Sequence, residues 1–138
     1  MYYLGMQKKI LIVEDDEAFF NLCATALKLK GYNVVHVADG SQALEVIANE
    51  KPDLILLDIV LPGMSGLDIL QNIKETEELK GNRVIMLTNF GTDANVNRAM
   101  ELGAEDYIMK YNVVPSELAN KVSVVLGDSV DSAVKFVS

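Results

Sequence analysis

The chain has 138 residues, of which 50% are hydrophobic, so it can form one domain around one substantial core. Its 12 basic and 20 acidic residues give a net charge of -8, which disfavours direct binding to nucleic acid or anionic membranes. A single cysteine excludes a disulfide within the chain. The chain also has no run of about 18 apolar residues, the length that would predict a membrane span. We therefore expect a cytoplasmic protein without direct nucleic-acid or membrane contact.

Strand-like and helix-like segments alternate along the chain, which is typical of a parallel sheet covered by helices on both faces. The predicted strands cover residues 9–14, 33–37, 53–57, 83–87 and 106–109. Each strand is followed by apolar residues that recur with helical spacing. The pattern predicts a doubly wound α/β domain with five strands and five helices.

The first two helices are bounded by capping residues. Asp16 is expected to cap the first helix, whose buried stripe includes Leu22 and Cys23 and which ends at Gly31. Ser41 is expected to cap the second helix. Asp16 is therefore interpreted as a structural residue.

The last three helices are predicted in the same way. Ser65 is expected to cap the third helix, and the fourth, over residues 93–102, is expected to bury Val96, Ala99 and Met100. Pro115 suits the first position of the fifth helix. The predicted organisation is an N-terminal extension (1–8), one domain (9–127) and a C-terminal tail or the start of a linker (128–138).

Polar residues collect where the predicted strands end, at the edge where open α/β sheets bind ligands. They are Glu14, Asp15 and Asp16 after the first strand, Asp58 after the third, Thr88 and Asn89 after the fourth, and Lys110 after the fifth. Converging carboxylates repel one another unless a cation lies between them, and oxygen ligands of this kind suit Mg²⁺. With a lysine and a hydroxyl added, the pocket can hold a phosphoryl group, and Asp58 is the natural nucleophile for an aspartyl phosphate.

Five stretches in order carry a family resemblance: KILIVEDDEAF, ADGSQALEVI, PDLILLDIVLPGMSGLDIL, VIMLTNFG and AMELGAEDYIMK. Over residues 9–127 the chain resembles the receiver domain of two-component response regulators, particularly stand-alone receivers of the chemotaxis-regulator type. The resemblance implies a flavodoxin-like, three-layer (βα)5 fold with strand order 2-1-3-4-5. It also implies a phosphorelay switch that is not an enzyme beyond slow self-phosphorylation from small donors and self-dephosphorylation.

The resemblance implies the residues that hold the metal and the phosphoryl group. Asp58 would be the phosphoacceptor. Asp15 would bind Mg²⁺ directly and Glu14 through water, with the backbone carbonyl of Val60 as a further ligand. The donor would be a sensor histidine kinase, a histidine phosphotransfer protein or a small molecule such as acetyl phosphate.

The resemblance also implies the parts of the switch. Lys110 would contact the phosphoryl group, and Thr88 would move toward it. Tyr107 would then turn inward and reshape the face of the fourth helix, fifth strand and fifth helix. A downstream protein, which the sequence does not name, would bind this face, and the chain would be a monomer or a phosphorylation-dependent dimer.

Three positions depart from the family pattern or bear on its kinetics. Tyr111 stands where the family has a proline after a cis bond, and a cis bond before a non-proline residue costs about 3 kcal/mol. The loop therefore either adopts that bond or takes another path. Val60 and Phe90, both apolar, would flank the line of water attack and predict slow loss of the phosphoryl group.

Two other classes of function remain open from the residues. A receiver-like scaffold that works without phosphorylation is one, although the intact acidic, hydroxyl and lysine positions argue against it. The second is an enzyme or redox carrier on the same sheet, although the chain has neither GxGxxG nor GxxxxGK[ST]. His36, the sole histidine, is interpreted as structural because no second histidine or thiolate lies near it in the sequence.

Overall fold

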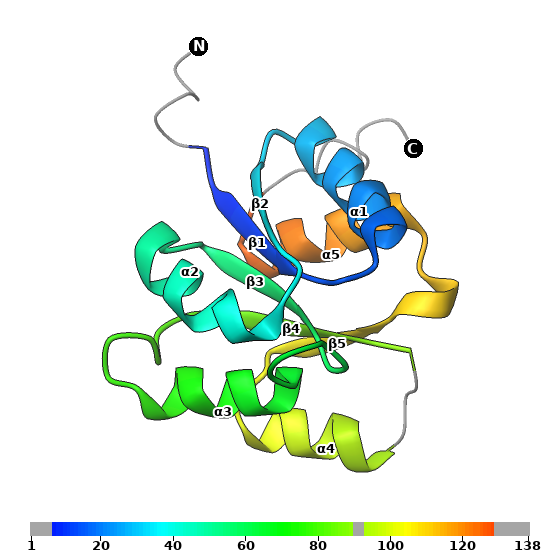
Figure 1. The fold of residues 1–138 in the computed structure, drawn as a ribbon. Coiled ribbons are helices and arrows are strands. Elements are labelled where there is room, and N and C mark those ends of the chain that lie inside the picture. Colours follow the sequence, from blue (N-terminus) through cyan, green and yellow to red (C-terminus); the bar gives the residue numbers. More distant parts are fainter. Residues whose placement is uncertain (1–6, 90–92, 129–138) are drawn as a thin grey trace.

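Five parallel strands form a sheet in the order β2-β1-β3-β4-β5 in the computed structural model, which describes residues 7–89 and 93–128 (Figure 1). The strands are β1 (Lys9–Val13), β2 (Asn33–Val37), β3 (Leu54–Asp58), β4 (Val84–Thr88) and β5 (Asp106–Met109). The predicted fold class and strand order are confirmed. Because β1 lies between β2 and β3, the strand order reverses there, and this is where open α/β sheets form their ligand crevice.

Helices cover both faces of the sheet, which makes three layers (Figure 1). On one face lie α1 (Glu17–Leu29) and α5 (Pro115–Val125); on the other lie α2 (Ala43–Glu50), α3 (Gly66–Glu75) and α4 (Asp93–Glu101). Short 3-10 helices, η2 (Gly40–Gln42) and η3 (Lys110–Asn112), precede α2 and follow β5. Among the described residues, no helix is long and apolar enough to span a bilayer.

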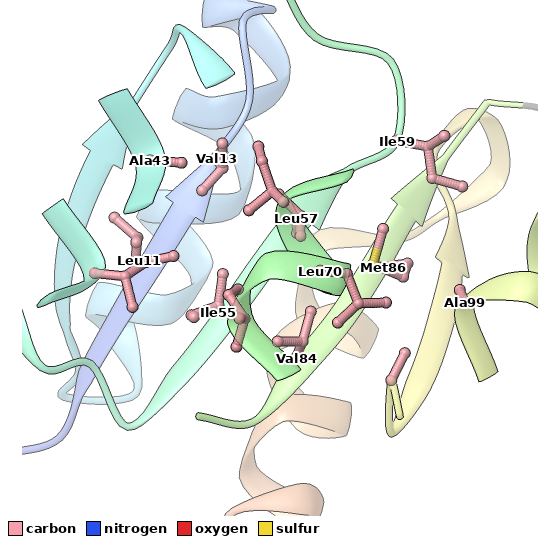
Figure 2. Close-up of a cluster of buried hydrophobic side chains, with 14 of the residues drawn as sticks. Leu11, Val13, Ala43, Ile55, Leu57, Ile59, Leu70, Val84, Met86 and Ala99 are labelled. Carbon is pink, nitrogen blue, oxygen red and sulfur yellow. The ribbon is translucent and has the colours of Figure 1, made fainter. Parts of the chain in front are cut away.

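Alternating residues of the central strands point to opposite faces and build two cores. On the α2–α4 side, Ile55 and Leu57 pack with Leu70 and Met86, among others (Figure 2). On the α1 and α5 side, the intervening residues pack with Cys23, Leu27, Leu118 and Val122; they include Ile10, Ile12, Leu54, Leu56, Ile85 and Leu87. This burial on both faces explains why the strand sequences are apolar almost throughout.

The predicted buried faces of two helices were partly wrong. Leu22 is 57% exposed, and Ala24 is buried instead. The reason is that Phe20 packs against β2 by stacking on His36, which turns the buried face of α1 away from Leu22. Met100 of α4 is 44% exposed because Ala99, one position earlier, is the buried contact of that helix.

The predicted helix caps hold at α1 and α3 and fail at α2. Asp16 accepts a hydrogen bond from the Phe19 amide at 3.1 Å, and Ser65 accepts one from the Asp68 amide. At the second helix Ser41 is not the cap: it lies inside η2, whose N-cap is Asp39, and the N-cap of α2 itself is Gln42, which makes no capping hydrogen bond with its side chain.

Candidate functional site

The polar pocket is built by the carboxyl ends of the strands. Glu14 directly follows β1, Asp58 ends β3 and Thr88 ends β4, while Lys110 follows β5. Asp58 and Thr88 thus belong to their strands, one residue further than predicted, because Asp58 pairs with Leu87 and Thr88 with Met109. The parallel registers bring these four residues to one edge of the sheet, as expected.

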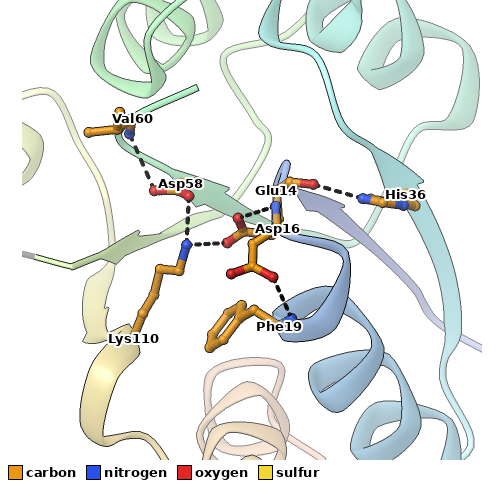
Figure 3. A network of polar contacts seen from close by, with 7 residues as sticks. All are labelled: Glu14, Asp16, Phe19, His36, Asp58, Val60 and Lys110. Carbon is orange, nitrogen blue, oxygen red and sulfur yellow. Dashed lines mark hydrogen bonds and ion pairs between the residues drawn. The ribbon is translucent and has the colours of Figure 1, made fainter. Parts of the chain in front are cut away.

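The Lys110 ammonium bridges two carboxylates in the centre of the pocket (Figure 3). Its Nζ lies 2.8 Å from Asp58 Oδ2 and 2.7 Å from Glu14 Oε1. The Lys110, Asp58 and Glu14 side chains are 7%, 4% and 0% exposed. Charges this deeply buried are tolerated only when paired, since removal of one partner leaves the other without compensation.

The environment shifts the protonation of both partners of this pair. Burial raises the pKa of the Glu14 carboxyl to about 7, with Asp58 adding to the shift and Lys110 and the Asp16 amide opposing it. For Lys110, burial lowers the pKa, but the contacts with Asp58 and Glu14 outweigh it and the net shift is upward. The lysine is therefore firmly charged, whereas Glu14 holds its negative charge only against a cost of burial.

Three carboxylates converge on a space that suits a metal ion. One oxygen from each of Glu14, Asp15 and Asp58 can be chosen so that all three lie within 4.8 Å of one another. Glu14 Oε1 is buried and, apart from its ion pair with Lys110, accepts no hydrogen bond from the described residues. Asp15 is exposed, so an ion could keep water ligands on that side. This donor set fits Mg²⁺, which takes a few carboxylate oxygens and retains water.

The remaining predicted residues lie around the pocket. The Val60 amide donates a hydrogen bond to Asp58 Oδ1 at 3.3 Å, and the Val60 side chain is 69% exposed. Thr88 is buried, whereas Tyr107 on β5 is 37% exposed. Phe90 lies outside the described residues.

The loop after β5 takes the second of the two expected paths. Among the described residues there is no cis peptide bond, so the Lys110–Tyr111 bond is trans. The chain forms η3 directly after β5, and the Tyr111 side chain is 70% exposed. Lys110 nevertheless reaches Asp58 from this turn.

Sequence reasoning missed two neighbours of the pocket. The Phe19 ring lies below the Lys110 ammonium, with its centroid 5.0 Å from Nζ (Figure 3). The His36 Nε2 atom lies 2.7 Å from the Glu14 backbone oxygen. The pairing of β1 with β2 sets Ile12 opposite His36, which could have suggested that His36 lies near the end of β1. No comparable signal identifies Phe19.

The parallel sheet and its acidic, lysine-containing edge define a flavodoxin-like domain built for binding at the carboxyl ends of its strands. Residues 10–123 match the response regulator receiver domain family. The chain belongs to this family, which consists of signalling domains rather than a classical group of enzymes.

Individual relatives agree with this assignment. The chain is 40% identical over 119 residues to the phosphate regulon transcriptional regulatory protein PhoB of Pseudomonas aeruginosa, a match covering 86% of this chain and 52% of PhoB. The CheY-like receiver domain protein of Methanospirillum hungatei superposes with a TM-score of 0.80 at 34% identity, covering 88% of this chain and 94% of that one. The BeF3-activated N-terminal receiver domain of Klebsiella pneumoniae RstA gives 0.78 at 37% identity, covering 86% and 97%. The chain thus spans about half the length of PhoB.

Proposed function

We propose that this chain is a phosphorylatable receiver whose Asp58 accepts a phosphoryl group from a phosphohistidine of a sensor histidine kinase or a histidine phosphotransfer protein. The observation that carries the proposal is the buried Asp58 carboxylate, held by Lys110 at 2.8 Å beside an acidic cluster that fits Mg²⁺. A purely structural ion pair would need neither Asp15 nor the buried, incompletely satisfied oxygen of Glu14. Conversely, a phosphorylation-independent scaffold would gain nothing from this arrangement.

The two oxygens of Asp58 suit different tasks. Oδ2 accepts from the Lys110 ammonium at 2.8 Å, whereas Oδ1 accepts only a long hydrogen bond, 3.3 Å, from the Val60 amide in the contacts described. We infer that Oδ1 attacks phosphorus. The new O–P bond replaces the P–N bond of the phosphohistidine, and the leaving imidazole keeps the nitrogen electron pair and takes up a proton.

The chain's own groups would bind the transferred oxygens. The Lys110 ammonium is near enough to donate to a phosphoryl oxygen once Asp58 Oδ1 carries the group, and the Thr88 hydroxyl would supply a further donor. Glu14, Asp15, Asp58 and the carbonyl of Val60 would hold Mg²⁺, which, when bound, neutralises charge on the phosphoryl oxygens.

The output would be a shift between two conformations. Attraction of the Thr88 hydroxyl to the phosphoryl group would draw the buried Thr88 side chain toward Asp58, and Tyr107, now 37% exposed, would turn inward. This movement changes the surface of α4, β5 and α5. We propose that a downstream protein, or a second phosphorylated copy, binds that surface.

The remaining proposals concern the chain as a whole. We propose residues 9–127 as the receiver and 128–138 as a tail or linker, with residues 1–8 as an N-terminal extension. The chain would act in the cytoplasm. Because the net charge is -8, any contact with DNA would be made by another domain or another protein.

Intact mass spectrometry after incubation with acetyl phosphate and Mg²⁺ tests the proposal. We expect the mass of the parent protein to increase by one phosphoryl group. No increase is expected when a chelator is present or in Asp58→Ala. Asp53→Asn is the matched control at the other end of β3, where Asp53 accepts a hydrogen bond from the Lys9 amide, and it should still be phosphorylated. If neither acetyl phosphate nor a phosphorylated kinase gives an adduct, the scaffold becomes the better account.

A further inference from the structure

We propose that His36 is a positioning residue for the metal site. Its imidazole holds the Glu14 backbone, and this keeps the side chains of Glu14 and Asp15 in the geometry that binds Mg²⁺. This inference rests on the proposed function, because it assumes that Glu14 and Asp15 bind the ion. His36 itself does not touch the pocket; Figure 3 shows it on the far side of Glu14 from Lys110.

The contact has only one chemically acceptable form. His36 Nε2 lies 2.7 Å from the Glu14 carbonyl oxygen. A carbonyl oxygen accepts and cannot donate, so Nε2 must carry a proton and donate it. The strand β2 ends at Val37, whose oxygen accepts the Glu14 amide at 2.9 Å, so the Glu14 carbonyl lies where the strand pairing stops. The imidazole supplies a donor at that point.

A second contact fixes the plane of the imidazole. The Phe20 ring stacks on it with the centroids 3.7 Å apart and the planes 8° from parallel. Phe20 is in the first turns of α1, the helix that begins directly after the acidic loop. The stack ties β2 to the start of α1 and the His36–Glu14 hydrogen bond ties it to the end of β1, so the segment that carries Glu14 and Asp15 is held at both ends.

These contacts leave Glu14 little freedom. Its amide donates to Val37, its carbonyl accepts from His36, and Oε2 accepts from the Asp16 amide at 2.9 Å. The remaining oxygen, Oε1, faces Lys110. Loss of the His36 donor would let the backbone move at the residue that aims Oε1 and precedes Asp15. Changes in groups that orient metal ligands typically weaken metal binding by about 10- to 100-fold.

Two substitutions separate the hydrogen bond from the ring. His36→Phe keeps an aromatic ring for Phe20 to stack on and removes the donor. His36→Gln removes the ring but places an amide Nε2 donor the same number of bonds from Cβ. Isothermal titration with Mg²⁺, without phosphodonor, should show about tenfold weaker binding for His36→Phe. For His36→Gln we expect binding within about threefold of the parent, because the donor is restored.

The outcomes distinguish this inference from the function beneath it. If the parent binds Mg²⁺ and His36→Phe binds equally well, the inference is wrong while the proposed function stands. It is equally overturned if His36→Gln is as weak as His36→Phe, since the ring rather than the donor would then matter. If the parent itself binds no Mg²⁺, the proposed metal site fails and the inference with it.

A measurement on the unaltered protein keeps the test independent of whether a variant folds. Nitrogen NMR of the neutral imidazole, at about pH 8 where an ordinary histidine is uncharged, should show the proton on Nε2. A proton on Nδ1 would contradict the proposed hydrogen bond.

Discussion

Ion pairs lie at both edges of the sheet, but they differ in stoichiometry and burial. At the edge where the strands begin, each cation meets one carboxylate: Lys8 with Asp128, Lys9 with Glu50 and Arg83 with Glu105. These side chains are 30–42% exposed. At the opposite edge one ammonium serves two carboxylates, with side chains 0–7% exposed and a third carboxylate nearby.

The difference separates an edge whose ion pairs can stabilise the fold from an edge whose charges suit the proposed function. Exposed one-to-one pairs contribute up to about 1 kcal/mol each and leave no charge unbalanced. An excess of buried carboxylates is unfavourable for the isolated domain, because each must be desolvated and they repel one another. Such an arrangement is expected where binding of a cation relieves the conflict.

The largest expected effect on stability comes from the backbone that packs against Asp58, at the edge of the sheet where the strands end. A Cβ on Gly66 would overlap the Asp58 carbonyl oxygen and lie 2.8 Å from Ile59 Cα, both backbone atoms. Gly66→Ala should therefore lower the free energy of unfolding by about 3 kcal/mol, measured by urea denaturation, and impair phosphorylation. Gly81→Ala is the control in the loop before β4, because nothing lies within 4 Å of its added Cβ. If the two variants are equally stable, the tight packing of α3 under Asp58 is refuted.

The second prediction concerns pH, in the metal-free protein. The pKa of Glu14 is raised from 4.5 to about 7 in the folded state, chiefly by burial. Between those values the folded state binds more protons than the unfolded state, so stability falls as pH rises. From about pH 5 to 7 this contribution should remove about 2 kcal/mol of unfolding free energy.

Glu14→Gln isolates that contribution, because the amide does not titrate. Urea unfolding in chelator at both pH values should show the loss in the parent and not in the variant. Equal pH dependence in the two proteins would mean that Glu14 is not the titrating group. The acidic edge would then lack the destabilising charge that distinguishes it from the opposite edge.

Much of this contrast was predictable from sequence. The alternation of apolar strands with helical stripes fixed the fold class, and acids at strand ends marked the pocket because parallel strands finish at a common edge. The apolar pattern did not locate the ends of β3 and β4. The strand pairing shows that Asp58 and Thr88 are the last residues of these strands.

The predictions that were wrong or incomplete concern contacts between segments that are distant in the sequence. The buried face of α1 depends on the stack of Phe20 on His36. This is a contact with another element, which the spacing of apolar residues along α1 does not reveal. His36 has no second histidine or thiolate near it in the sequence, so its neighbours along the chain do not predict the contact of its Nε2 with the Glu14 carbonyl oxygen. The periodicity of apolar residues shows which residues of a helix can be buried, but not which contact with another element decides how the helix is rotated about its axis.

A third prediction tests the other edge of the sheet. Tyr32 is 6% exposed, and its hydroxyl hydrogen-bonds Ser123 at 3.0 Å and donates to Asp128. Tyr32→Phe should lower the free energy of unfolding by about 1 kcal/mol and leave phosphorylation unchanged. Tyr111→Phe, at a side chain 70% exposed, should change neither. Slower phosphorylation of Tyr32→Phe at saturating Mg²⁺ would show that the two edges are coupled.

The smallest effect is expected at the Arg83–Glu105 pair. Arg83 donates to both oxygens of Glu105, with Nη2 2.8 Å from Oε1, yet the two side chains are 42% and 33% exposed. Arg83→Met should therefore cost about 0.5 kcal/mol in thermal or urea unfolding at low salt. The cost should vanish near 1 M NaCl, where the screening length falls to about 3 Å. A loss that persisted in high salt would show that this exposed pair behaves like the buried contacts of Lys110, and burial would then not be what separates the two edges.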